Sequence, residues 1–82
     1  MVPIMTPTTI DWDRERERAN SQTQASLIRL ARLSGYEVVE GAGKGSHAKV
    51  TRAGLGRPVI IPNKIYRLNA QQIIDALRRG LD

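Results

Sequence analysis

The chain contains a single histidine, His47, which follows Lys44, Gly45 and Ser46 and stands two residues before Lys49. An imidazole titrates near neutral pH, so it can accept or donate a proton, and lysines can bind a phosphate and stabilise its developing charge. RNA carries its own nucleophile in the 2′-hydroxyl, and its cleavage needs mainly positioning, a proton acceptor and charge stabilisation. One histidine with neighbouring lysines can therefore support RNA cleavage, although a lone histidine is more often incidental.

The segment before His47 is rich in glycine, with Gly41, Gly43 and Gly45 at alternate positions. A Rossmann or Walker loop must lead into a helix whose N-terminus holds phosphate, whereas here a strand is expected to follow. Lys44 also precedes Gly45, which breaks the Gly-Lys-Ser/Thr order of the Walker motif. Two alternatives remain: a hairpin loop in which glycine provides positive φ, or an exposed loop that lets an RNA backbone approach its amides and Lys44.

A metal centre is not expected, because the chain has no cysteine and Glu37, Glu40 and Asp75 fall in separate predicted elements without ligand spacing. No motif for another cofactor is present. The absence of cysteine also fits a reducing compartment. The N-terminal stretch lacks the basic region of a signal peptide and is too short to span a bilayer. We therefore expect a cytoplasmic protein without a membrane partner.

The chain is basic, with 13 Lys and Arg against 8 Asp and Glu and a net charge of +5. The excess lies in residues 21–82, because residues 1–20 hold four acids and three arginines. This balance favours a polyanionic partner, with nucleic acid ahead of acidic protein or phospholipid. Only Trp12, Tyr36 and Tyr66 are aromatic, which argues against the stacking platforms of single-strand-binding modules. RNA is expected to be bound mainly through its phosphates.

Two amphipathic helices are predicted within residues 21–82. Ser21 and Gln24 have the spacing of a capping box at the start of the first helix, and Gly35 ends it. Asn69, three residues before Gln72, is expected to start the second helix. The apolar stripe of the first helix contains Leu27, Leu30, Ala31 and Ser34, widened by Ile28. The stripe of the second contains Ala70, Ile73, Ile74, Leu77 and Leu81.

Three short antiparallel strands are expected between these helices, within residues 36–39, 47–52 and 58–62. The order αβββα predicts an α+β fold, a two-layer sandwich with a three-stranded antiparallel sheet and both helices on one face. On the middle strand, the period of two places Ala48 and Val50 in the core. His47 and Lys49 are then expected on the open face of the sheet, together with Thr51.

Residues 1–20 lack a core-forming stripe and are expected to be an N-terminal extension of the domain at 21–82. In the run 13–18, acids and arginines alternate, so opposite charges meet at i,i+3 but like charges meet at i,i+4. The favourable and unfavourable charge pairs therefore roughly cancel, and they do not stabilise a helix in this segment. The extension is expected to be a solvated, frayed tail, or else a partner-contacting segment anchored by Trp12.

Four segments together resemble the HicA toxin family, in order and spacing: residues 27–36, 44–47, 59–62 and 73–77. They correspond to a helix that ends in Gly-aromatic, a Gly-Ser-His before the second strand, a Val-Pro strand and a closing helix. The resemblance covers roughly residues 21–82. It implies a fold like that of double-stranded-RNA-binding domains, ribosome-independent cleavage of mRNA, and neutralisation by a HicB-type antitoxin protein.

The resemblance implies that His47 is the catalytic residue. Our leading hypothesis is therefore a metal-independent endoribonuclease, the toxin of a type II toxin-antitoxin system. In it Lys44 and Lys49 bind the phosphate, while Gly45 and Ser46 shape the approach to it.

The alternative is a non-catalytic RNA-binding module or inactive HicA-like relative. The loop before Gly45 looks about two residues longer than in the family, and Ala48 stands where many members have a polar residue. A third possibility, which the sequence disfavours, is a domain whose basic face binds an acidic protein.

Overall fold

The computed structural model of the chain describes residues 10–41, 47–52 and 56–80. Its elements in chain order are α1 (Trp12–Glu17), the 3₁₀ helix η1 (Ala19–Ser21), α2 (Gln24–Leu33), β1 (Glu37–Glu40), β2 (Ala48–Thr51), β3 (Val59–Ile61) and α3 (Arg67–Arg79). The predicted order αβββα is confirmed by α2, the strands and α3. The short helices α1 and η1 precede this unit.

The strands form one antiparallel sheet in the order β1-β2-β3, so β2 lies in the middle. Residues that pair across an antiparallel sheet project to the same face. Val50, which pairs with Val38 and Val59, is fully buried beneath the sheet, whereas its neighbour Lys49 is exposed. The row around Lys49, which faces away from the helices, consists of Val39, Lys49 and Ile60.

The two edges of the sheet are short. The edge strand β3 is three residues long and lies between Pro58 and Pro62. The other edge strand, β1, begins and ends with a glutamate, Glu37 and Glu40. Proline has no backbone N–H, so neither residue that flanks β3 can donate a backbone hydrogen bond to a neighbouring strand.

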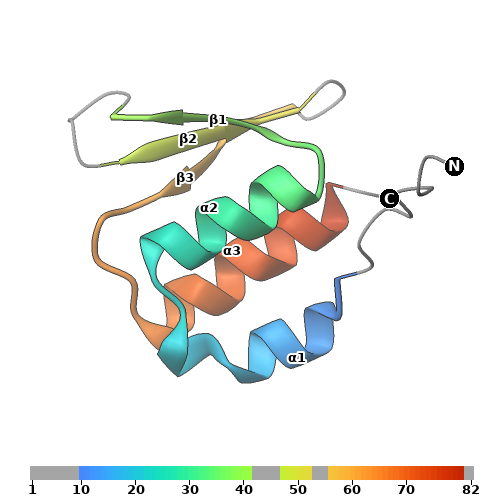
Figure 1. The fold of residues 1–82 in the computed structure, drawn as a ribbon, viewed down its shortest axis with the longest axis vertical. Coiled ribbons are helices and arrows are strands. Elements are labelled where there is room, and N and C mark those ends of the chain that lie inside the picture. The colour runs from blue at the N-terminus through green and yellow to red at the C-terminus, as the bar shows by residue number, and fades with distance from the viewer. Residues whose placement is uncertain (1–9, 42–46, 53–55, 81–82) are drawn as a thin grey trace, which may run out of the picture.

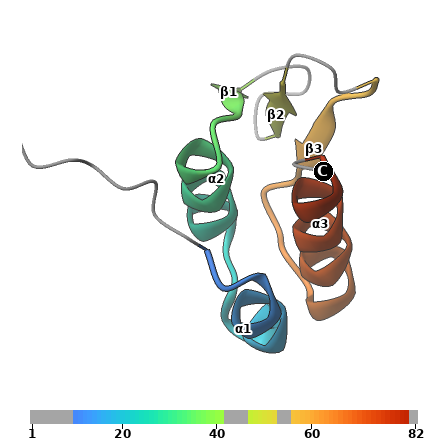
Figure 2. The same ribbon diagram turned by 90° about the vertical axis from the view of Figure 1, so that its right-hand side faces the viewer.

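The molecule is built in layers (Figures 1 and 2). The sheet lies on α2 and α3, which run side by side, and α1 lies on the side of these helices remote from the sheet. Both predicted helices therefore cover the same face of the sheet, as expected. The largest fully buried side chains come from both layers and are Leu27, Val50, Ile61, Ile74 and Leu77.

Helix α2 begins two residues later than predicted. Ser21 belongs to η1, and Thr23 is the N-cap: its hydroxyl accepts from the Ser26 amide at 3.1 Å, and the Ser26 hydroxyl accepts from the Thr23 amide at 2.8 Å. Both residues have cap-forming side chains, but only Thr23 has the extended backbone that an N-cap requires, with φ −123° and ψ 169°. The prediction of Ser21 as the cap is therefore wrong.

The end of α2 agrees with the sequence. Gly35 has φ +89°, and the amides of Gly35 and Tyr36 donate to the carbonyls of Arg32 and Ala31 at 3.1 and 3.0 Å. These two bonds form a Schellman motif, in which only glycine adopts the left-handed conformation without strain. Tyr36 is thereby turned into the core, where its hydroxyl donates to the Leu77 carbonyl of α3 at 2.7 Å.

Helix α3 begins at Arg67, earlier than predicted, because Asn69 acts from the third helical position rather than as the cap. The Asn69 side-chain oxygen accepts a hydrogen bond from the amide of Tyr66, the residue at the N-cap. Four members of the predicted stripe of α3 are confirmed, since Ala70, Ile73, Ile74 and Leu77 are buried. The fifth, Leu81, lies outside the described residues.

Residues 12–21 differ from the solvated tail that their charge alternation predicts. Ala19 is only 3% exposed, and two ion pairs link α1 to α3: Arg16 to Asp75 at 3.1 Å and Arg78 to Asp13 at 2.8 Å. The charges that cancel within α1 thus find partners on another helix. None of the helices in the described part of the chain is long and apolar enough to cross a membrane. The boundary at residue 21, as the start of an independently folding unit, stays a prediction.

Candidate functional site

His47 directly precedes β2 and is partly buried rather than open to solvent. Its Nδ1 lies out of contact with solvent and has no hydrogen-bond partner. An unpaired buried nitrogen costs about 1 to 3 kcal/mol, so this arrangement is unfavourable for stability. Because Nδ1 is out of contact with solvent, Nε2 is the ring nitrogen of His47 that is the candidate for contact with a substrate.

The position of His47 follows from the alternation of β2. Ala48 and Val50 are 1% and 0% exposed and anchor the strand on the helices, which directs Lys49 outward. Ala48 pairs with Ile61, whose carbonyl accepts from the Gln24 side chain of α2 at 3.2 Å. His47 thus lies at the end of the sheet where α2 begins.

The outer face of the sheet is the face that carries Val39, Lys49 and Ile60. Val39 and Ile60 are 55% and 47% exposed, and Lys49 lies between them. The ammonium group of Lys49 makes no hydrogen bond or ion pair within the described residues. The face therefore presents one unpaired ammonium group flanked by aliphatic side chains, next to the strand end that holds His47.

Three of the predicted site residues, Lys44, Gly45 and Ser46, lie outside the described residues. The structure therefore places only His47 and Lys49 of the predicted set, two residues apart, with His47 directly before β2 and Lys49 within it. At the start of the glycine-rich segment, Gly41 has φ +74°, as expected for a glycine that provides positive φ in a loop.

Several arginines that contribute to the net charge have structural partners. Arg32 pairs with Glu40 at 3.0 Å, which links α2 to β1. Arg52 donates to the Gly80 carbonyl at 3.2 Å and lies over the Tyr36 ring, 5.7 Å from its centroid. Sequence reasoning could not assign Arg52 individually, because its partners lie far away in the chain.

Other cations lack a carboxylate partner in the described part of the chain. Besides Lys49, they include Arg57 and Lys64, which flank β3, and both are exposed. Arg57 lies two residues before β3 and Lys64 lies three residues after it, and β3 pairs with β2. Within the same residues, no three His, Cys, Asp or Glu side chains are grouped so that they could hold a metal ion.

Comparisons with known proteins give no relative for this chain. No protein-family model, no curated protein and no solved structure matches it.

Proposed function

We propose that the chain is a metal-independent endoribonuclease in which His47 transfers the proton. The observation that carries the proposal is the position of His47 directly before β2 and two residues from Lys49, whose ammonium group has no partner among the described residues and lies on the outer face of the sheet. The net charge of +5 supports a polyanionic substrate. The resemblance to HicA toxins supports mRNA as that substrate, a cytoplasmic location and a HicB-type antitoxin as the protein partner.

The proposed chemistry is an intramolecular transesterification. Nε2 of His47 accepts the proton of an RNA 2′-hydroxyl, the 2′-oxygen forms a bond to the adjacent phosphorus, and the bond from phosphorus to the 5′-oxygen breaks. The leaving 5′-oxygen takes up a proton from solvent water, His47 releases its own proton to solvent, and a 2′,3′-cyclic phosphate remains. Lys49 stabilises the negative charge that develops on the phosphate, with Lys44 as a second cation. Gly45 and Ser46 would allow the RNA backbone to approach closely.

A second candidate function, RNA binding without cleavage, is favoured by one specific observation. A catalytic imidazole is usually oriented by a hydrogen bond to its second nitrogen, and the Nδ1 atom of His47 has no such partner. Ala48, at a position where the HicA family often has a polar residue, adds no group to the site. Under this alternative, the unpaired cations bind phosphate and no bond is broken.

The two functions separate in one assay. The full chain is incubated with an end-labelled RNA oligomer and with the same oligomer made of 2′-deoxynucleotides, each in the presence of EDTA. The endoribonuclease proposal requires cleavage of the RNA alone and products that end in a 2′,3′-cyclic phosphate. RNA binding without any product would support the second function, and cleavage of both oligomers would contradict the proposed chemistry.

A further inference from the structure

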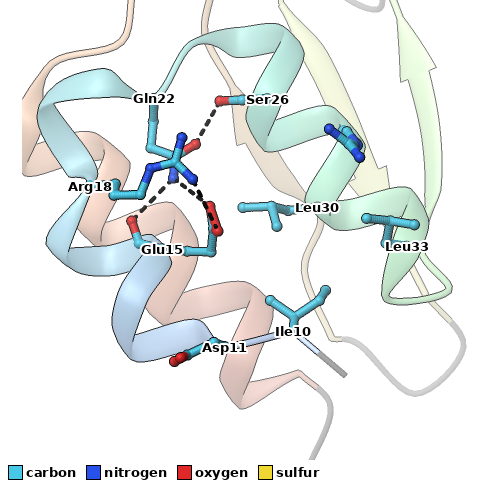
Figure 3. Close-up of a pocket in the computed structure, with 9 residues that line it drawn as sticks. Ile10, Asp11, Glu15, Arg18, Gln22, Ser26, Leu30 and Leu33 are labelled. Carbon is cyan, nitrogen blue, oxygen red and sulfur yellow. Dashed lines mark hydrogen bonds and ion pairs between the residues drawn. The ribbon is translucent and has the colours of Figure 1, made fainter. Parts of the chain in front are cut away.

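A groove lies on the opposite side of the molecule from the sheet, between α1 and α2. Helix α1 packs against α3 and η1, whereas the described residues of α1 and α2 do not pack against each other. The space left between α1 and α2 is a pocket of about 280 Å³ (Figure 3). This volume is larger than the cavity of about 150 Å³ that binds benzene in another protein, so it is enough for a small organic molecule.

One side of this pocket is apolar. Ile10, Leu30 and Leu33 lie together there, and they come from two separate segments of the chain (Figure 3). Leu30 is 8% exposed and forms the floor, while Leu33 remains 46% exposed and forms the rim. An aliphatic ligand that covered the exposed surface of Leu33 would remove apolar area from water, which favours binding.

The other side is polar, and its groups bind one another. Gln22 is 6% exposed, and its side-chain nitrogen donates to the Glu15 carbonyl and to the Glu15 carboxylate, both at 3.1 Å. Its side-chain oxygen accepts from the Ser26 hydroxyl at 2.6 Å. The Glu15 carboxylate also lies 3.8 Å from the Arg18 guanidinium. These groups therefore fix the wall of the pocket and are not left without partners.

The charged groups that line the pocket are Asp11, Glu15, Arg18 and Arg29. Asp11 accepts from the Arg14 amide at 3.1 Å as the N-cap of α1, and Glu15 pairs with Arg18. Only Arg29, among these lining groups, has neither an ion pair nor a hydrogen bond in the described part of the chain. A guanidinium binds a carboxylate through two parallel hydrogen bonds. Arg29 is therefore the group in this pocket that is available to bind an anionic ligand.

We propose that this pocket binds a small aliphatic carboxylate. Arg29 and Leu33 lie one helical turn apart on α2, so the carboxylate would contact Arg29 while the aliphatic chain covers Leu33 and Leu30. The pocket volume fits a chain of about six carbons with its carboxylate. This site shares no residue with the proposed RNA site, and either proposal can fail without the other.

Hexanoate is the probe. Titrated into the ¹⁵N-labelled full chain, it should cause saturable NMR shifts confined to the amides around Leu30, Leu33 and Ile10. The dissociation constant is expected at about 1 mM, as is typical of a ligand of this size. Hexanol and hexylammonium, which have the same chain without the negative charge, should bind about tenfold more weakly.

The Arg29→Gln variant tests the role of the charge. It should weaken hexanoate binding about tenfold, leave hexanol binding unchanged and leave RNA cleavage unchanged. Arg67→Gln, which removes an equally exposed cation from α3 outside the pocket, should leave both ligands unaffected. Tighter binding of hexylammonium than of hexanoate would overturn the proposal. So would shifts that do not saturate, or equal hexanoate affinity in the parent chain and in Arg29→Gln.

Discussion

The α1–α3 interface and the outer face of the sheet both carry cations, but only the interface neutralises them. At the interface, Arg16 contacts Asp75 and Arg78 contacts Asp13, so four charges cancel in two pairs. On the outer face, Lys49 makes no ion pair among the described residues. The comparison teaches that net charge alone does not locate a binding surface. We expect the RNA-binding surface to lie where the fold leaves cations without partners, and the following predictions test that expectation.

The largest expected effect concerns His47 at the end of the sheet. His47→Ala should reduce RNA cleavage by about 10² to 10⁴, the usual contribution of a general acid or base. RNA affinity should stay the same. Stability should fall by less than about 1 kcal/mol, because the unpaired Nδ1 leaves no partner orphaned when the ring is removed. Gel-based cleavage, filter binding and thermal unfolding of the same preparation provide the three measurements, and undiminished cleavage would refute the assignment.

Deletion of residues 1–20 examines the interface as a whole. Residues 21–82 should still unfold cooperatively, because both long helices and the sheet lie within them. The free energy of unfolding should fall by about 2 to 4 kcal/mol, since the buried Ala19 and the partly buried Trp12 are lost. Denaturant titration of both chains measures the difference. A shortened chain without a cooperative transition would show that α1 is part of the folding unit.

A smaller effect is expected at the contact that joins the start of β1 to α3. Tyr36→Phe removes the hydroxyl that donates to the Leu77 carbonyl, and it should destabilise the fold by about 1 kcal/mol. Tyr66→Phe is the matched control, because Tyr66 is 67% exposed. Removal of its hydroxyl group should not change the midpoint of thermal unfolding. Equal midpoints for the two variants would mean that the buried hydrogen bond does not stabilise the fold.

The smallest effect compares one cation from each region. RNA affinity should fall with salt, with a log–log slope of about −0.7 for each phosphate contact on single strands. Lys49→Gln should make this slope shallower by about 0.7, the value expected for the loss of one phosphate contact. Arg78→Gln, which removes a cation of the interface, should leave the slope unchanged and cost less than about 1 kcal/mol of stability, as is usual for an exposed ion pair. If Arg78→Gln changed the slope as much as Lys49→Gln did, the absence of an ion-pair partner would not identify the cations that contact RNA.

Local patterns in the sequence were sufficient for most of the fold. The alternation of Ala48, Lys49 and Val50 predicted which face of β2 is buried, and Gly35 marked the end of α2, because each depends on a few neighbouring residues. The packing of α1 could not be predicted in this way. Its ion pairs join residues 59 and 65 positions apart, Arg16 with Asp75 and Asp13 with Arg78, and only the folded chain brings them together.

For the candidate site, the sequence identified residue types but not their surroundings. It placed His47 beside Lys49 on the open face, and Lys49 is exposed there as expected. The partial burial of His47 was not predicted, because the alternation of a strand indicates the face on which a side chain lies but not what covers that side chain. The groove between α1 and α2 was missed altogether, because it exists only through the placement of α1 against α3.

The two prolines that flank β3 have a consequence for the behaviour of the protein in concentrated solution. An unpaired sheet edge is a template for the strand of another molecule, and long flat edges lead to aggregation. At β3 the exposed edge is three residues long and ends at Pro58 and Pro62, so a second chain could form very few hydrogen bonds with it. At the opposite edge, β1 is only four residues long and has a charged residue at each end, which also disfavours pairing with the strand of another molecule. We therefore expect neither edge of the sheet to promote the growth of fibrils.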